Sequence, residues 1–94
     1  MIEKREGLTV FQKKVLLATM EIPEGETRTY AWVASRAGHP GASRAAGNAL
    51  ARNPFPPYVP CHRVIASGGS LGGYSGKGGV AAKKKLLARE GVII

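Results

Sequence analysis

The chain has 94 residues, enough for one small domain with a single hydrophobic core. Hydrophobic residues make up 44% of it and charged residues 21%, a composition that excludes wholesale disorder. Lys and Arg number 14 against 6 Asp and Glu, so the net charge of +8 favours a polyanionic partner such as DNA, RNA or an anionic membrane surface.

Two helices are predicted near the start of the chain. Thr9 and Gln12 have the spacing of a capping box, and the apolar repeat behind them predicts a helix from about Val10 to Met20. Thr29 is placed to cap a second helix, from Tyr30 to Ala37. Its expected inner face consists of Tyr30, Val33, Ala34 and Ala37.

A third helix, roughly Ala42 to Arg52, follows after a short link that contains Gly38 as a left-handed cap residue. This spacing is typical of a helix-turn-helix, here over about residues 29–52. The buried side of the third helix is expected to hold small residues, namely Ala42, Ala45, Ala46 and Ala49, together with Leu50. Arg44 is the one long side chain on the opposite side, which suits entry into a DNA groove. The alternative is a small-residue helix that packs tightly in the core.

The second half of the chain begins with a proline-rich stretch, residues 53–60, that predicts a fixed loop leading into an active-site segment up to residue 63. Residues 64–66 and 71–74 flank a Ser-Gly-Gly-Ser turn, which predicts a hairpin that would form a wing over 64–74. The final helix, about Val80 to Glu90, carries a run of three lysines, Lys83 to Lys85. That run is either a solvated face or a contact with phosphate.

Cys61 is the only cysteine, so the chain has no internal disulfide, and too few histidines accompany it for an ordinary zinc site. It lies in Pro60-Cys61-His62-Arg63, where a neighbouring His and Arg both favour the reactive thiolate. Among the few acids, Glu90 is the chosen partner to orient His62, because it ends a helix that can lie back across the pocket. The alternative is an inert buried cysteine beside a surface His and Arg.

The chain resembles the C-terminal domain of the 6-O-alkylguanine-DNA alkyltransferases, over nearly everything from Thr9 to Gly91. The resemblance rests on blocks that arrive in the family's order: Thr9-Val10-Phe11-Gln12, Ile22-Pro23-Glu24-Gly25-Glu26-Thr27, Ser43-Arg44-Ala45-Ala46-Gly47, Asn53-Pro54, Pro60-Cys61-His62-Arg63-Val64-Ile65, Gly72-Gly73-Tyr74-Ser75-Gly76 and Leu86-Leu87-Ala88-Arg89-Glu90-Gly91. It implies a mainly helical α+β fold of the winged helix-turn-helix type, direct reversal of alkylation damage, and no cofactor or metal.

The resemblance also implies roles for individual residues. Cys61 would accept the alkyl group irreversibly, so that one protein molecule repairs one lesion. His62 would act through a water as its base, with Glu90 polarising His62 and Asn53 forming the hinge between recognition helix and active-site loop. Arg44 would fill the space left by the flipped nucleotide. The other expected DNA contacts are Tyr30, Ala31, Ser43, Gly47 and Ser67, and the guanine pocket would be lined by Tyr30, Leu50, Val64, Tyr74, Ser75 and Gly76.

Physical reasoning agrees with these roles, since an alkyl group on guanine O6 is out of reach until the base leaves the stack. The expected partner is double-stranded DNA containing alkylated guanine, bound by a monomer, with no membrane. A free thiol and a charged N-terminus without an export signal predict a cytoplasmic protein, associated with the nucleoid in a prokaryote or nuclear in a eukaryote.

Two alternatives stay open. The family's usual members carry an additional N-terminal domain, for which the similarity from Thr9 leaves no room, so residues 1–94 are expected to form a single domain. Chains of this length resemble the alkyltransferase-like proteins, which bind alkylated guanine without repairing it and typically have another residue, often Trp, at the position of Cys61. Such a sensor would recruit excision-repair proteins. The second alternative is a winged-helix regulator without preference for damaged DNA.

Overall fold

The computed structural model describes residues 7–53, 59–67, 71–72 and 78–93. In chain order the described elements are α1 (Val10–Thr19), β1 (Arg28–Thr29), α2 (Tyr30–Arg36), α3 (Ser43–Ala51), the 3-10 helix η1 (Cys61–Arg63), β2 (Val64–Ile65) and α4 (Gly79–Arg89). This is the mainly helical α+β fold that the sequence predicts, and each predicted α-helix begins and ends within one residue of the observed one.

The helix starts follow the predicted capping chemistry. The Thr9 hydroxyl accepts from the Gln12 amide at 3.0 Å, and the Gln12 side chain accepts from the Thr9 amide at 2.8 Å. The Thr29 hydroxyl accepts from the Trp32 amide at 3.1 Å at the start of α2. Gly38, which follows the C-cap residue Ala37 of α2, has a φ of 87°, so it is the left-handed residue expected there.

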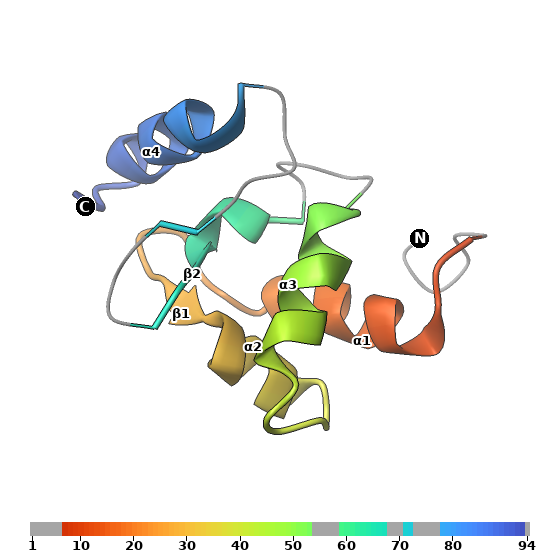
Figure 1. The fold of residues 1–94 in the computed structure, drawn as a ribbon. Coiled ribbons are helices and arrows are strands. Elements are labelled where there is room, and N and C mark those ends of the chain that lie inside the picture. The colour runs from red at the N-terminus through yellow and green to blue at the C-terminus, as the bar shows by residue number, and fades with distance from the viewer. Residues whose placement is uncertain (1–6, 54–58, 68–70, 73–77, 94) are drawn as a thin grey trace.

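Three helices, α1, α2 and α3, pack on one another and enclose the core (Figure 1). Small side chains allow this close packing on the α3 side, where Ala46 is fully buried and Ala49 and Leu50 are nearly so. Two residues expected on that face differ, since Ala42 is half-buried and Ala45 is exposed. The apolar stripe of α3 is therefore narrower than predicted, because only one side of this helix touches α1 and α2.

A short parallel sheet joins the helical group to the second half of the chain. Arg28 pairs with Val64, and Thr29 with Ile65. The sequence predicts instead that Val64 and Ile65 pair with residues 71–74 in a hairpin. Leu71 and Gly72 are not in a strand, and residues 68–70, 73 and 74 lie outside the described part of the chain, so the wing stays a prediction.

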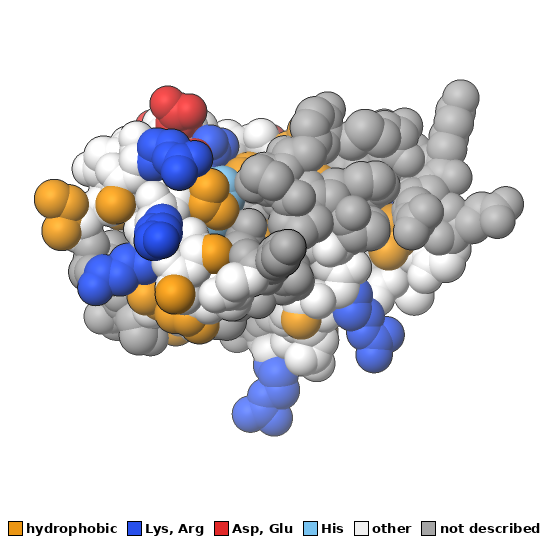
Figure 2. Space-filling model, turned by 90° about the horizontal axis from the view of Figure 1, so that it is seen from above, with side chains coloured by type: hydrophobic (Ala, Val, Ile, Leu, Met, Phe, Trp, Pro, Cys, Tyr) orange, Lys and Arg blue, Asp and Glu red, His pale blue; other side chains and the backbone are white. Residues whose placement is uncertain are grey.

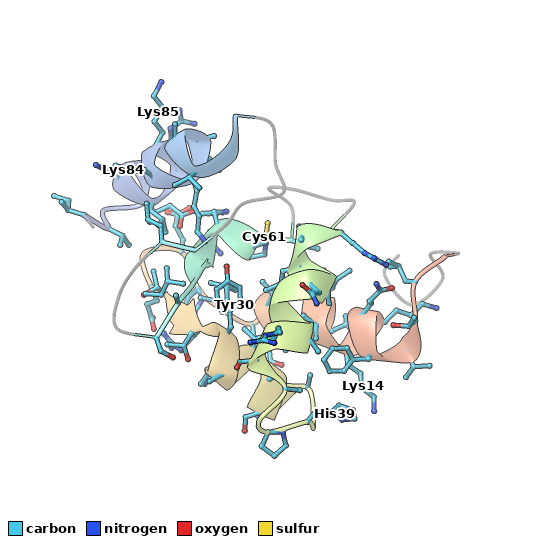
Figure 3. The ribbon with its side chains drawn as sticks, viewed as in Figure 1. Lys14, Tyr30, His39, Cys61, Lys84 and Lys85 are labelled. Carbon is cyan, nitrogen blue, oxygen red and sulfur yellow. The ribbon has the colours of Figure 1, made fainter. Side chains whose placement is uncertain are left out.

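Helix α4 stands apart from the three-helix group, on the other side of η1 and β2 (Figure 1). Lys84 and Lys85 point outward from it (Figure 3), whereas Lys83 is completely buried. The lysine run is therefore not one uniform surface, because Lys83 lies on the inner face with Leu87, one turn further along the helix. Among the described residues, no helix is long and apolar enough to cross a membrane.

Candidate active site

Cys61 and His62 occupy the single turn of η1. The turn is closed by the Cys61 amide donating to Val59 O at 2.7 Å and the Arg63 amide donating to Pro60 O at 2.9 Å. Both functional side chains are buried, with 4% of Cys61 and 2% of His62 exposed. The sequence left open how adjacent residues can act together, since a strand would point them to opposite faces. A 3-10 turn removes that obstacle, because its side chains are only about a third of a turn apart.

Glu90, the C-cap residue of α4, lies against His62. Its Oε2 is 3.0 Å from His62 Nε2, so the acid and base chosen from the sequence are in direct contact. This contact occupies Nε2, so Nδ1 is the ring nitrogen that is left to exchange a proton. Arg63 donates hydrogen bonds to the same carboxylate. These bonds are the main reason why the pKa of Glu90 is lowered to about 2. Glu90 is therefore ionised at neutral pH.

Lys83 is a site residue that the sequence reasoning did not identify. Its ammonium donates to Val64 O at 2.6 Å and to Leu71 O, and it lies 5.9 Å from the centre of the Tyr30 ring. Burial lowers the pKa of Lys83 to about 8, while the negative charge of a Cys61 thiolate acts in the opposite direction. That attraction is mutual, so a charged Lys83 favours the thiolate. The sequence does contain one indication that Lys83 faces inward: it lies four residues before Leu87, and therefore on the same face of the helix.

Asn53 connects the end of α3 to the segment that enters the site. Its backbone amide donates to Leu50 O at 3.0 Å, and its side-chain amide donates to Val59 O at 3.1 Å. Only 6% of Asn53 is exposed, so this link is protected from water. The Val59 carbonyl oxygen also accepts from the Cys61 amide. Asn53 is therefore linked through Val59 to the turn that carries the thiol.

Tyr30 extends from the start of α2 past α3 toward the site (Figure 3). Two glycines adjoin it. A Cβ atom added to Gly47 would lie 3.8 Å from the ring, which is an ordinary contact, whereas one added to Gly72 would lie 2.6 Å from the phenol oxygen. The second distance is far too short, so Gly72 is needed where the chain passes the hydroxyl, and its φ of 70° also favours glycine. The sequence reasoning had placed Tyr30 in this region but had given Gly72 no role.

The residues expected to meet DNA differ in exposure. Arg44, Ala31 and Ser67 are exposed, and Ser43 and Gly47 are half-buried. Seen from above, Lys and Arg side chains project at several separate points, and acidic side chains are few on the part of that face that the structure describes (Figure 2). On this face the positive charge is therefore spread over several places rather than gathered in one patch.

Two of the predicted pocket residues belong to the core, since Leu50 is 3% exposed and Val64 is fully buried. The other predicted pocket residues, Tyr74, Ser75 and Gly76, lie outside the described residues. A shallow groove of about 230 Å³ opens elsewhere, between the start of α1 and the side of α3, where Thr9, Gln12, Asn48 and Arg52 line it. It contains neither Cys61 nor Tyr30 and is separate from the candidate active site.

Comparison with known proteins identifies the chain's relatives. The family model for the "6-O-methylguanine DNA methyltransferase, DNA binding domain" matches residues 10–92. A methylated-DNA–protein-cysteine methyltransferase from Methanothermobacter thermautotrophicus is 55% identical over 86 residues, which are 92% of this chain and 47% of that protein. One from Cricetulus griseus is 48% identical, over 87% of this chain and 39% of its own length. The chain spans about half the length of the curated relatives it matches.

Solved structures resemble the fold closely. Mycobacterium tuberculosis OGT in complex with DNA has a TM-score of 0.84 and 48% identity, over 88% of this chain and 50% of that one. The Atl1 protein of S. pombe, in complex with damaged DNA containing O6-carboxymethylguanine, has a TM-score of 0.77 and 36% identity, over 87% of this chain and 76% of its own. At these identities the likeness extends beyond the arrangement of helices to the sequence itself.

Proposed function

Because the chain belongs to the family of the 6-O-methylguanine DNA methyltransferase DNA-binding domain, we propose that it repairs DNA by transferring an alkyl group from guanine O6 to Cys61. The observation that carries the proposal is a buried thiol adjacent in one turn to a histidine whose Nε2 lies 3.0 Å from an ionised carboxylate. An inert cysteine has no need of such a neighbour.

In the proposed reaction, His62 takes the proton of the Cys61 thiol, through a water, and the thiolate attacks the alkyl carbon. The carbon–oxygen bond breaks as the carbon–sulfur bond forms. The guanine oxygen keeps the electron pair, and the base regains a proton, for which the Tyr30 hydroxyl is the proposed donor. The products are unmodified guanine and S-alkylcysteine, so the protein is consumed in one turnover. Glu90 orients His62, and Lys83 favours the thiolate by its charge.

DNA binding is proposed to use α3, where Arg44 would take the place of the flipped base. Ala31, Ser43, Gly47 and Ser67 would contact the duplex around it. Leu50, Val64, Tyr74, Ser75 and Gly76 would shape the guanine pocket together with Tyr30, and Asn53 would hold the loop at the end of α3. The net charge of +8 supports attraction to phosphate that does not depend on sequence. We propose a monomer that works where the genome lies, in the cytoplasm or the nucleus.

The test is the intact mass of the protein after incubation with a short duplex containing one 6-O-methylguanine. We expect a gain of one methyl group for one hydrogen, at one equivalent per protein, and none in the Cys61→Ala variant. Tight, lesion-selective binding without a mass gain would refute the transferase and favour the sensor function, with excision-repair proteins as partners. Equal affinity for damaged and undamaged duplex would refute both.

A further inference from the structure

The Arg63 side chain is committed to Glu90. Its Nε donates to Glu90 Oε1 at 2.9 Å, and one terminal nitrogen donates to Oε2 at 2.7 Å. The other terminal nitrogen donates to Ile22 O at 2.9 Å, so the guanidinium is held at both ends. A paired geometry of this kind fixes the plane of a carboxylate as well as its position.

Glu90 Oε2 is shared, because His62 Nε2 also lies 3.0 Å from it. Arg63 therefore determines which way the oxygen facing His62 points. The group is tightly packed: 16% of the Arg63 side chain, 11% of Glu90 and 2% of His62 are exposed. The Glu90 backbone is also closely packed, since a Cβ atom added to Gly25 would lie 3.3 Å from the Glu90 carbonyl oxygen. The hydrogen bonds from Arg63 and the low exposure leave the carboxylate little freedom to turn elsewhere.

The charge of this cluster bears on the thiol. A neutral imidazole with an ionised Glu90 carries one negative charge, and a negative charge nearby opposes the formation of a thiolate. We propose that Arg63 is a positioning residue that fixes the Glu90 carboxylate against His62 and cancels its charge. The cluster beside Cys61 is then neutral before the proton is transferred and carries one positive charge, instead of none, once His62 has taken it. The proposal rests on the proposed function, because it assigns a role within the same reaction.

Other charged groups act on the same cluster. From α4, Lys83 acts on Cys61 and keeps its charge below about pH 8, the pKa to which burial lowers it. From the turn after α1, the Glu24 carboxylate acts on Arg63. From η1 come Cys61, His62 and Arg63 themselves. The test therefore uses the acidic limb of a pH–rate profile, where Lys83 remains charged in every variant.

The experiment uses the single cysteine of the chain, since iodoacetamide then reports on Cys61 alone. Rates of alkylation by iodoacetamide and by free benzylated guanine are measured against pH. The variants are Arg63→Met, which removes the charge, and Arg63→Lys, which keeps it without the paired geometry. Arg36→Met is the matched control, because Arg36 makes a similar pair with Glu21, at 2.7 Å, on the exposed end of α2. Circular dichroism establishes that each variant is folded.

We expect Arg63→Met to move the acidic limb upward by about one pH unit, which makes alkylation on that limb about tenfold slower. Arg63→Lys should keep the limb near its original pH but react more slowly at every pH. Arg36→Met should match the parent. A folded Arg63→Met variant whose rate falls equally at all pH values, with an unmoved limb, overturns the proposal and makes Arg63 merely structural. If the parent ignores benzylated guanine while the iodoacetamide limb still moves, the proposed function fails and the role of Arg63 stands.

Discussion

Replacing Lys83 with methionine should remove a specific pH dependence from the stability of the protein. Lys83 is fully buried, and burial lowers its pKa from 10.5 to about 8. Between these two values the unfolded chain binds a proton at this position and the folded chain does not. The free energy of unfolding therefore rises with pH across this interval. Folding with a charged Lys83 is penalised below about pH 8, and the penalty has gone above 10.5.

The magnitude follows from the size of the shift. Each unit of pKa difference is worth about 1.4 kcal/mol, so the lowered pKa of Lys83 accounts for at most about 3.5 kcal/mol between the two limits. Methionine also leaves Val64 O and Leu71 O without their donor, which destabilises the protein by a further amount. That loss is the same at every pH, so it changes the height of the stability curve and not its slope.

The assay is urea denaturation of the parent and Lys83→Met at several pH values between about 7.5 and 10.5, the interval in which the two proton affinities differ. Taking the difference between the two proteins removes the contributions of the tyrosines and the other lysines. Both proteins carry Cys61→Ala in this assay, because the ionisation of the thiol depends on Lys83. Lys84→Met is the matched control, since Lys84 lies next in the same helix and is exposed. Parallel curves for the parent and Lys83→Met would refute the reasoning and show that the buried ammonium titrates as it does in water.

Three further outcomes are expected. Arg44→Ala should slow alkyl transfer from a duplex but not from free benzylated guanine, because Arg44 is exposed on α3 and its proposed contact is with the DNA; equal slowing with both substrates would contradict this. Gly72→Ala should destabilise the protein by more than the about 1–2 kcal/mol of the left-handed conformation, because the new methyl meets the Tyr30 hydroxyl. Urea denaturation beside Gly38→Ala, with a similar φ and open space around it, measures the difference. A double Lys84→Ala, Lys85→Ala variant should leave the salt dependence of DNA binding unchanged; a slope reduced by about two would place both at phosphates.

Local patterns in the sequence were sufficient for the helices. The cap at Thr9, the cap at Thr29 and the left-handed Gly38 depend on contacts within a few residues, so the neighbouring sequence is enough to predict them. The strand pairing was harder. Val64 pairs with Arg28, which lies 36 residues earlier by subtraction of their numbers, and no local signal specifies such a partner.

The candidate site divides in the same way. Glu90 was predicted to lie beside His62 because the chain has few acidic residues and Glu90 lies at a helix end. The 3.0 Å contact between the two side chains agrees with that prediction. The sequence predicted that Arg63 favours the thiolate, but its pairing with Glu90 and the role of Lys83 were not anticipated, because charged residues next to one another in sequence are usually solvated. Only the packing of η1 against α4 reveals that both side chains turn inward.

The separate position of α4 bears on how the molecule opens. Among the described residues, the continuous cluster of buried apolar side chains draws on α1, α2, α3, η1 and β2, and none of its members comes from α4. Within the described part of the chain, the contacts of this helix include the buried Leu87 and the polar contacts of Lys83 and Glu90. Such an element is expected to detach in a local unfolding event of lower free energy than the rest. One such motion would take the carboxylate from His62 and the ammonium from Cys61 together, so native-state hydrogen exchange of the α4 amides would measure how often the thiol loses its activating neighbours.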